Sequence, residues 1–204
     1  MSEPRPTPVI PLHPHAGGAL RERDDESLMA LLCGGSQAAF EALVERHLPA
    51  VTRFCAKLVG EPAAGEDVAQ EILAQVWWER GRYQSRGRFV VYLFTLARNR
   101  CLNQLRGARR RTLRHEAVSP GGPDLAGAAA PEGLDALLET ERQREVRAAL
   151  HDLPHLQREA LLLRFDQELT YAEIARVMGS LEATVRARVF HGLRRLRERM
   201  GGEP

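Results

Sequence analysis

Apolar residues recur every three or four positions along most of this chain, which is the spacing of amphipathic helices. In the first clear run they fall at Phe40, Leu43, Val44, Leu48, Val51, Cys55 and Leu58. Pro49 predicts a kink or an interruption in that run, because proline cannot donate a backbone hydrogen bond inside a helix. Residues 60–62, Gly-Glu-Pro, then break the pattern. Apolar and polar residues do not alternate over any useful length, so we predict an all-α fold.

Two further segments combine an apolar face with a polar face. The first places Val68, Ile72 and Val76 on its apolar face. Its opposite face carries Asp67, Gln70, Glu71 and Gln75. The second segment places Val90, Phe94, Ala97, Cys101 and Leu105 on one face. Another of its faces carries Asn99, Asn103, Arg106 and Arg110. Such polar faces either bind a partner or simply face water, and periodicity alone does not decide between these two functions.

Changes in composition divide the chain into four parts. Residues 1–23 are rich in proline and aperiodic, so we predict a disordered tail. Residues 24–114 and 139–200 are predicted to form two small helical domains. Residues 115–138 collect proline, glycine and alanine, so we predict a flexible linker there. A coil of that length spans roughly 25–30 Å on average. We therefore expect the two domains to move independently in the free protein.

The charged residues are unevenly distributed along the 204-residue chain. Its 29 basic and 27 acidic residues give a net charge of +2. Seven arginines and no acidic residue lie within 98–114, and seven more arginines lie within 176–199. Two basic blocks indicate either an acidic polymer such as nucleic acid or two solvated helix faces. No apolar run is long enough to cross a membrane, so we predict no membrane insertion. The three cysteines are too few and too scattered for a disulfide framework, which favours a reducing, cytoplasmic compartment.

The most informative motif lies within residues 169–196. Thr170 and Glu173 have the spacing of a capping box, which predicts that a helix begins there. Gly179 supplies a turn, and a second helix follows with Val185 and Val189 on its apolar face. A short helix, a glycine turn and a longer helix form the helix-turn-helix pattern, whose second helix enters the major groove of DNA. The alternative interpretation is an ordinary helical hairpin with a basic surface.

Residues 153–197 resemble region 4 of bacterial RNA polymerase sigma factors, specifically of the small extracytoplasmic-function (ECF) class. The first domain resembles region 2 of the same family: residues 39–60 are similar to region 2.1, residues 66–77 to region 2.2, and residues 82–106 to regions 2.3 and 2.4. The resemblance implies an ECF-type sigma factor that binds core RNA polymerase and directs promoter-specific initiation. It also implies three partners, namely core polymerase, promoter DNA both double-stranded and melted, and an anti-sigma factor.

The resemblance implies a separate function for each part of the chain. Region 2.2 would bind the β′ clamp of the polymerase through Asp67, Gln70, Glu71 and Gln75. Regions 2.3 and 2.4 would melt the promoter and read its minus-ten element through Arg86, Arg88, Phe89, Tyr92, Arg98, Asn99, Asn103 and Arg106. Region 4 would dock on the β flap and read the minus-thirty-five element through Thr184, Arg186, Ala187, Arg188, Phe190 and His191.

Several of these residues have a purely structural alternative. The polar face at residues 67–75 could be solvated. Core packing is an equally good interpretation of Phe89 and Tyr92, whose rings could otherwise stack on unpaired bases. Phe190 could contact a thymine methyl group or pack against the preceding helix.

Two other classes of protein compete with the sigma-factor interpretation. A stand-alone helix-turn-helix regulator would need a dimerisation surface, and the first domain has no long heptad seam. A small enzyme would need a zinc or thiol site. His151 and His155 have helical spacing, but Pro154 separates them and a third ligand is lacking. The three cysteines, Cys33, Cys55 and Cys101, lie in apolar patterns and are predicted to be buried. We therefore predict no catalytic activity, no metal and no cofactor.

Overall fold

The structure, a computed structural model, describes residues 18–84, 87–118 and 141–201. Within these ranges the chain is α-helical and has no strand, which confirms the all-α prediction there. The first half contains α1 (Gly18–Arg21), α2 (Asp25–Cys33), α3 (Gln37–Val59), α4 (Pro62–Glu79), the 3-10 turn η1 (Arg80–Arg82) and α5 (Phe89–Val118). The second half contains α7 (Glu141–His151), α8 (His155–Leu161), the π-helical turn η2 (Leu162–Asp166), α9 (Tyr171–Met178) and α10 (Glu182–Arg199).

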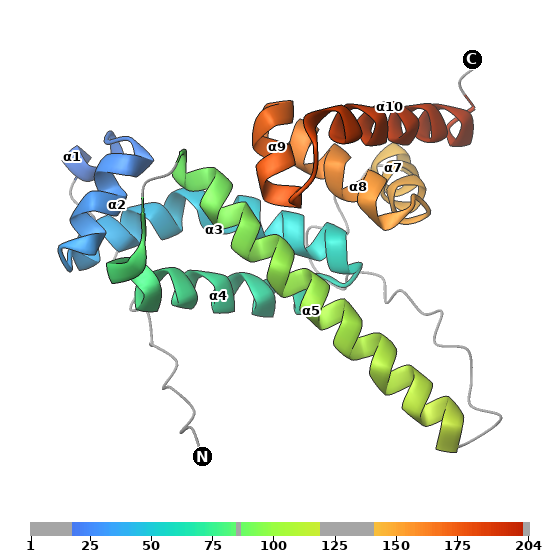
Figure 1. Cartoon of the computed structure of the whole chain (residues 1–204), viewed down its shortest axis with the longest axis horizontal. Helices are drawn as coiled ribbons and strands as arrows, with labels where there is room; N and C mark the ends of the chain where they lie inside the picture. Colours follow the sequence, from blue (N-terminus) through green and yellow to red (C-terminus); the bar gives the residue numbers. More distant parts are fainter. Residues whose placement is uncertain (1–17, 85–86, 119–140, 202–204) are drawn as a thin grey trace.

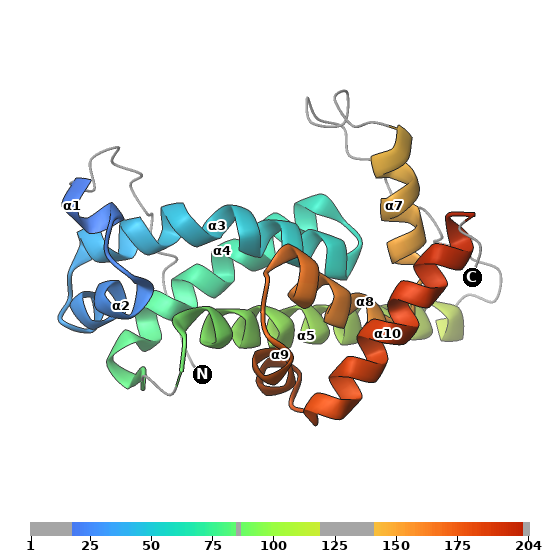
Figure 2. The same ribbon diagram turned by 90° about the horizontal axis from the view of Figure 1, so that it is seen from above.

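Three long helices, α3, α4 and α5, run side by side and form the body of the first domain (Figures 1 and 2). Their facing side chains are apolar, and Phe54 meets Phe94 edge to face with ring centroids 5.2 Å apart. Gly65 brings α4 very close to α3, since a Cβ atom there would lie only 2.5 Å from Ala56 Cα. A glycine is required at this crossing because any side chain would push the two helices apart.

Helix α3 continues through Pro49, so the predicted interruption at that proline is wrong. Proline removes one backbone hydrogen bond from a helix interior. Val44 and Val51, on either side of it, are both buried. Burial of the apolar faces on both sides of Pro49 offsets the lost hydrogen bond. The local sequence pattern does not show how large that burial is.

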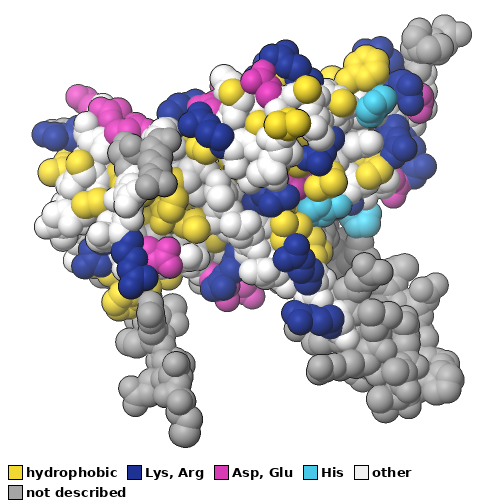
Figure 3. Space-filling model, viewed as in Figure 1, with side chains coloured by type: hydrophobic (Ala, Val, Ile, Leu, Met, Phe, Trp, Pro, Cys, Tyr) yellow, Lys and Arg dark blue, Asp and Glu magenta, His cyan; other side chains and the backbone are white. Residues whose placement is uncertain are grey.

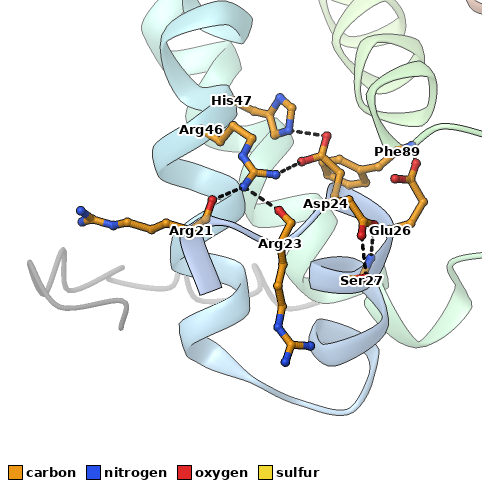
Figure 4. Close-up of polar contacts among 9 residues, drawn as sticks. Arg21, Arg23, Asp24, Glu26, Ser27, Arg46, His47 and Phe89 are labelled. Atoms are coloured by element: carbon orange, nitrogen blue, oxygen red, sulfur yellow. Dashed lines mark hydrogen bonds and ion pairs between the residues drawn. The ribbon is translucent and has the colours of Figure 1, made fainter. Parts of the chain in front are cut away.

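The tail prediction is wrong for residues 18–23, because Gly18–Arg21 form the short helix α1. Arg46 on α3 holds this segment: its guanidinium donates to the carbonyl oxygens of Arg21 and Arg23, each at 2.8 Å (Figure 4). The same guanidinium pairs with Asp25, and His47 Nε2 lies 2.9 Å from the other oxygen of that carboxylate. Arg21 also pairs with Glu45 of α3, and Leu20 packs against the core, so contacts with distant residues order a stretch whose own composition favours disorder. Residues 1–17 lie outside the described part of the chain.

The far end of the first domain also differs from the prediction. Helix α5 runs on to Val118, four residues beyond the predicted domain boundary at residue 114. In Figure 1 its C-terminal half projects away from α3 and α4. Residues 115–118, His-Glu-Ala-Val, contain no helix breaker, whereas Pro120 disfavours helical backbone at the residue before it. The rest of the predicted linker, residues 119–140, lies outside the described residues.

The helix-turn-helix prediction is confirmed in detail. The Thr170 hydroxyl accepts a hydrogen bond from the backbone of Glu173, and the Glu173 carboxylate accepts one from the backbone of Thr170. Gly179 ends α9 with a φ of 59°, a left-handed conformation that glycine adopts at low cost. Helix α10 then packs on α8 at Gly192, where a Cβ atom would lie 2.9 Å from Leu161 Cδ1.

The two domains pack against each other in this structure, and their independent motion in the free protein stays a prediction. Helix α9 lies against α5, and η2 and α8 contact α3 (Figure 2). One continuous apolar cluster includes buried residues of both halves, from Leu28 to Val189. The length of a linker limits how far two domains can separate but contains no information about how well their surfaces fit.

Candidate functional site

Helix α4 presents the predicted polar face to solvent. Asp67, Gln70 and Glu71 are exposed and Gln75 is half-buried, whereas Val68, Ile72 and Val76 on the opposite face are buried. Trp78 extends the polar face by one more turn and is 45% exposed. Its neighbour Trp77 instead packs on Phe40. An exposed tryptophan beside acidic and amide side chains is typical of a surface that binds another protein.

Helix α5 presents a second polar face. Asn99, Asn103 and Arg106 are exposed at the predicted spacing of one helix face. Arg100 is also exposed and forms an ion pair with Glu71 of α4, with 2.7 Å between its Nε and Glu71 Oε2. Amide side chains can pair with base edges, and arginines can contact phosphates. This face of α5 therefore suits binding to nucleic acid, and the polar face of α4 lies beside it.

The two aromatic residues at the start of α5 have different environments. Phe89 is 1% exposed and packs against His47 and Tyr92, so it has no free face for stacking on a base and the core-packing alternative holds. Tyr92 is half-buried, with its ring centroid 5.1 Å from that of Tyr83. Burial, together with the charges of Glu79 and Tyr83, raises the pKa of Tyr92 to about 12, so its hydroxyl stays protonated. Arg86 lies outside the described residues.

Two of the arginines predicted to contact the minus-ten element are bound by the second domain. The Arg88 guanidinium lies 3.2 Å from the Glu173 carboxylate on α9. Arg98 pairs through Nε with Glu159 on α8, a carboxylate with no solvent exposure. Burial raises the pKa of Glu159, against the opposing effects of Arg98 and Arg188. Neither contact was predicted, because the partners are 85 and 61 positions apart in the sequence.

Helix α10 presents five of its six predicted residues to solvent, namely Thr184, Arg186, Ala187, Phe190 and His191. Phe190 is 63% exposed, so the alternative that it packs against the preceding helix is wrong. The sixth residue, Arg188, is half-buried and lies 3.3 Å from the Ser180 hydroxyl. Figure 3 shows arginine side chains over the α9–α10 end and along α5 on the same face of the molecule.

Arg186 is held in place before any partner binds. Its guanidinium lies over the Tyr171 ring, 4.6 Å from the ring centroid, and pairs with Glu182 one helical turn earlier. A planar cation stacked on an aromatic ring loses less conformational freedom on binding than a free side chain does.

The cysteines only partly follow their prediction. Cys55 and Cys101 are buried as expected, but Cys33 is exposed at the end of α2, where its thiol donates to the Arg80 carbonyl oxygen at 3.1 Å. Within the described ranges, no three His, Cys, Asp or Glu side chains come together as metal ligands would. No helix in those ranges is long and apolar enough to cross a membrane.

Two helical domains, one carrying a helix-turn-helix with an exposed cationic helix, place the protein in the helix-turn-helix class, whose second helix typically enters the major groove of DNA. The chain matches the sigma-70 region 2 family over residues 43–111 and the sigma-70 region 4 family over residues 143–196. It is 34% identical to the RNA polymerase sigma factor CarQ of Myxococcus xanthus, covering 82% of this chain and 92% of CarQ. It is also 29% identical to the ECF RNA polymerase sigma factor SigK of Mycobacterium sp. (strain JLS), covering 80% and 83% of the two chains.

Solved structures agree with this assignment. The sigma factor RpoE, solved in complex with the anti-sigma factor NepR from Bartonella quintana, is 25% identical with a TM-score of 0.64, covering 81% of this chain and 98% of RpoE. CnrH, solved with the cytosolic domain of CnrY, shares the fold with a TM-score of 0.65 at 22% identity, covering 87% and 97% of the two chains. The chain belongs to the sigma-70 family and, within it, to the ECF sigma factors. It directs promoter-specific transcription initiation, and the comparisons do not favour the stand-alone regulator.

Proposed function

We propose that three helix faces divide the work of this sigma factor: α4 binds core RNA polymerase, α5 opens and reads the minus-ten element, and α10 reads the minus-thirty-five element. The observation that carries the proposal is that most of each face is exposed, with half-buried exceptions such as Arg98 and Arg188, while the opposite side of its helix packs in a core. The residue functions below extend the family assignment to particular side chains.

The α4 face, formed by Asp67, Gln70, Glu71 and Gln75, binds the β′ clamp. Its carboxylates and amides complement arginines on a partner protein. Trp78 adds an aromatic contact at the end of this face, where it is already 45% exposed. An exposed acidic face on a rigid helix binds without rearrangement, which limits the entropic cost of association.

The α5 face reads the minus-ten element through Asn99 and Asn103, with Arg98, Arg100 and Arg106 on the phosphates. Arg86 and Arg88 contact the DNA backbone near the start of α5, and Tyr92 presents the edge of its ring to the DNA. Binding to separated strands more tightly than to duplex shifts the population toward open DNA, so melting needs no hydrolysis. Phe89 supports this face from the core rather than touching DNA.

The α10 face reads the minus-thirty-five element in the major groove. Arg186 and Arg188 suit guanine edges and phosphates, and Phe190 suits a thymine methyl group. Thr184, Ala187 and His191 complete the surface, and the same domain docks on the β flap. The protein acts in the cytoplasm beside the polymerase and has no catalytic activity of its own. An anti-sigma factor inhibits it, a proposal that the complex of RpoE with the anti-sigma factor NepR supports.

Reconstituted transcription tests this proposal. Purified protein is mixed with bacterial core polymerase that lacks any sigma factor, with fragmented genomic DNA as the template, and transcript starts are sequenced. We expect discrete starts that share two upstream elements. A matched reaction with Asn99→Ala and Asn103→Ala should lose the preference at the minus-ten element while still binding core polymerase. Tight duplex binding by the protein alone, with no starts, would instead support a stand-alone regulator.

A further inference from the structure

Helix α10 begins without a side-chain cap on its first turn. Its N-cap residue is Leu181, whose side chain makes no cap hydrogen bond and is 76% exposed. By contrast, α9 begins with a complete capping box at Thr170 and Glu173. An uncapped first turn leaves backbone N–H groups without a partner in the protein and favours fraying. Contacts from outside the helix therefore decide how firmly the start of α10 is held.

Two arginines of α10 reach back to the elements that precede it. The Arg186 guanidinium lies over the Tyr171 ring at the start of α9, 4.6 Å from the ring centroid. Arg188 Nη1 donates to the hydroxyl of Ser180, in the turn between the two helices, at 3.3 Å. Arg186 is exposed, whereas Arg188 is half-buried. Arg186 therefore combines a fixed guanidinium with the greater access to solvent.

The Tyr171 ring is itself held in place. It is half-buried and packs against the apolar core. A second guanidinium, that of Arg164 on η2, lies 5.1 Å from the same ring centroid and donates to the Leu169 carbonyl oxygen at 3.0 Å. The ring therefore links η2, α9 and α10. A ring anchored in this way limits the positions that the Arg186 guanidinium can take.

Glu182 restricts the same guanidinium from within α10. Its Oε1 accepts a hydrogen bond from Arg186 Nη2 at 2.5 Å, across one helical turn. A guanidinium has several N–H donors, so those not engaged with Glu182 can serve the O6 and N7 acceptors of a guanine. With the ring and the carboxylate both in place, few orientations of Arg186 remain that could meet a base edge.

We propose that Tyr171 is a positioning residue for recognition of the minus-thirty-five element: its ring, together with Glu182, orients Arg186 so that α10 favours guanine at one position of that element. The base preference rests on the proposed function, whereas the orientation of Arg186 by Tyr171 does not. Stacking reduces the conformational freedom that the arginine loses on binding, and it does so for one orientation of the guanidinium. Tyr171 therefore contributes to discrimination between bases, and it acts through Arg186.

The orientation is measured first, by NMR on the free full-length protein. Protons over the face of an aromatic ring resonate upfield, so the side-chain protons nearest the Arg186 guanidinium should be shifted upfield. Arg186→Ala identifies these resonances by their loss. Tyr171→Phe keeps the ring and should keep the shift, whereas Tyr171→Leu should return the resonances to the values of an exposed arginine. An unshifted Arg186 in the unaltered protein would overturn the proposal.

The base preference is measured with core polymerase and a promoter library whose minus-thirty-five element is randomised, by counting the transcripts from each template. Arg186→Ala identifies the position that Arg186 reads, because the preference for guanine is lost there. Tyr171→Leu should reduce the preference at that position about two- to fivefold, the value of an exposed cation–π contact, and should leave the other positions unchanged. Tyr171→Phe should retain the full preference.

A matched control and a folding measurement complete the design. Phe165→Leu truncates another aromatic ring of the same domain, on η2 and 57% exposed, and should leave every base preference unchanged. Circular dichroism confirms that each variant is folded.

The possible outcomes distinguish positioning from other functions of Tyr171. An equal loss on every template in Tyr171→Leu would show that Tyr171 only supports the helix-turn-helix. The same uniform loss in Tyr171→Phe would show that the hydroxyl holds a phosphate. Either result in place of a selective loss would overturn the proposal. Base preferences unchanged by Arg186→Ala would contradict the proposed function of Arg186 and with it the effect on bases, whether or not the upfield shift is present.

Discussion

Glu71 on α4 and Arg100 on α5 form an ion pair, with 2.7 Å between Glu71 Oε2 and Arg100 Nε. The pair joins the face proposed for polymerase binding to the helix proposed for promoter reading. Both side chains are about half exposed, so the pair itself contributes little to stability. The position of Glu71 is therefore better explained by a partner than by the fold.

We predict that Glu71→Ala weakens binding to core polymerase while changing the free energy of unfolding by less than about 1 kcal/mol. Competition against a labelled sigma factor measures the first quantity, and urea denaturation measures the second. Glu45→Ala is the matched control, since Glu45 forms an equally exposed ion pair with Arg21 away from the α4 face. Equal polymerase affinity in the two variants would show that α4 is only a solvated surface.

Phe89 leads to the opposite expectation. It is fully surrounded by the first-domain core, and its backbone N–H donates to the Glu26 carboxylate at 2.9 Å, which fixes the start of α5 against α2 (Figure 4). We predict that Phe89→Ala lowers the free energy of unfolding by about 3–5 kcal/mol, the usual cost of emptying such a site. Phe190→Ala, which truncates a ring that is 63% exposed, serves as the control and should leave stability nearly unchanged. A Phe89→Ala protein that is stable but fails in promoter melting would instead indicate that Phe89 contacts DNA.

Local sequence patterns predicted the helices, whereas contacts between residues far apart in the sequence determined which side chains are exposed. The capping box at Thr170 and the polar face of α4 depend on spacings of three or four residues, which the sequence displays directly. Phe89 and Tyr92 are only three positions apart, yet one is buried and the other is half-buried, because their neighbours come from α2, α3 and Tyr83, which follows η1. No periodicity in α5 contains that information.

The pairing of Arg98 with Glu159 was beyond local reasoning for the same reason. A run of arginines predicts a basic surface, and it cannot show which arginine an acidic residue 61 positions later will neutralise. The order in residues 18–23 likewise depends on Arg46, which is more than twenty positions away. Sequence identified the helices and the candidate residues, whereas the availability of each residue depended on tertiary contacts.

The lowered pKa of Asp25 predicts how the free energy of unfolding depends on pH. Burial acts to raise its pKa, but the hydrogen bonds and charges of His47 and Arg46 outweigh burial and hold it below its ordinary value of 3.8. The folded state therefore binds this proton less readily than the unfolded state, so the carboxylate stabilises the fold above pH 3.8 and loses that effect as pH falls through the lowered pKa. We predict that Asp25→Asn is less stable than the unaltered protein at pH 7 and that the difference shrinks below pH 3.8. Urea denaturation across this range measures it, and a difference that stays constant would contradict the assignment.

The α10 face makes the most specific prediction about promoter choice. Arg186 is already stacked on Tyr171, and a good arginine contact to a base is worth about 1–3 kcal/mol of discrimination. Arg186→Ala and Phe190→Ala should therefore reduce transcription from promoters with an intact minus-thirty-five element and have little effect once that element is scrambled. Leu193→Ala, an apolar truncation one turn further along the same helix and 40% exposed, is the control and should leave the ratio between the two templates unchanged. If all three variants lowered transcription equally from both templates, α10 would act through the polymerase rather than by reading DNA. Its exposed face would then bind the β flap instead of the major groove.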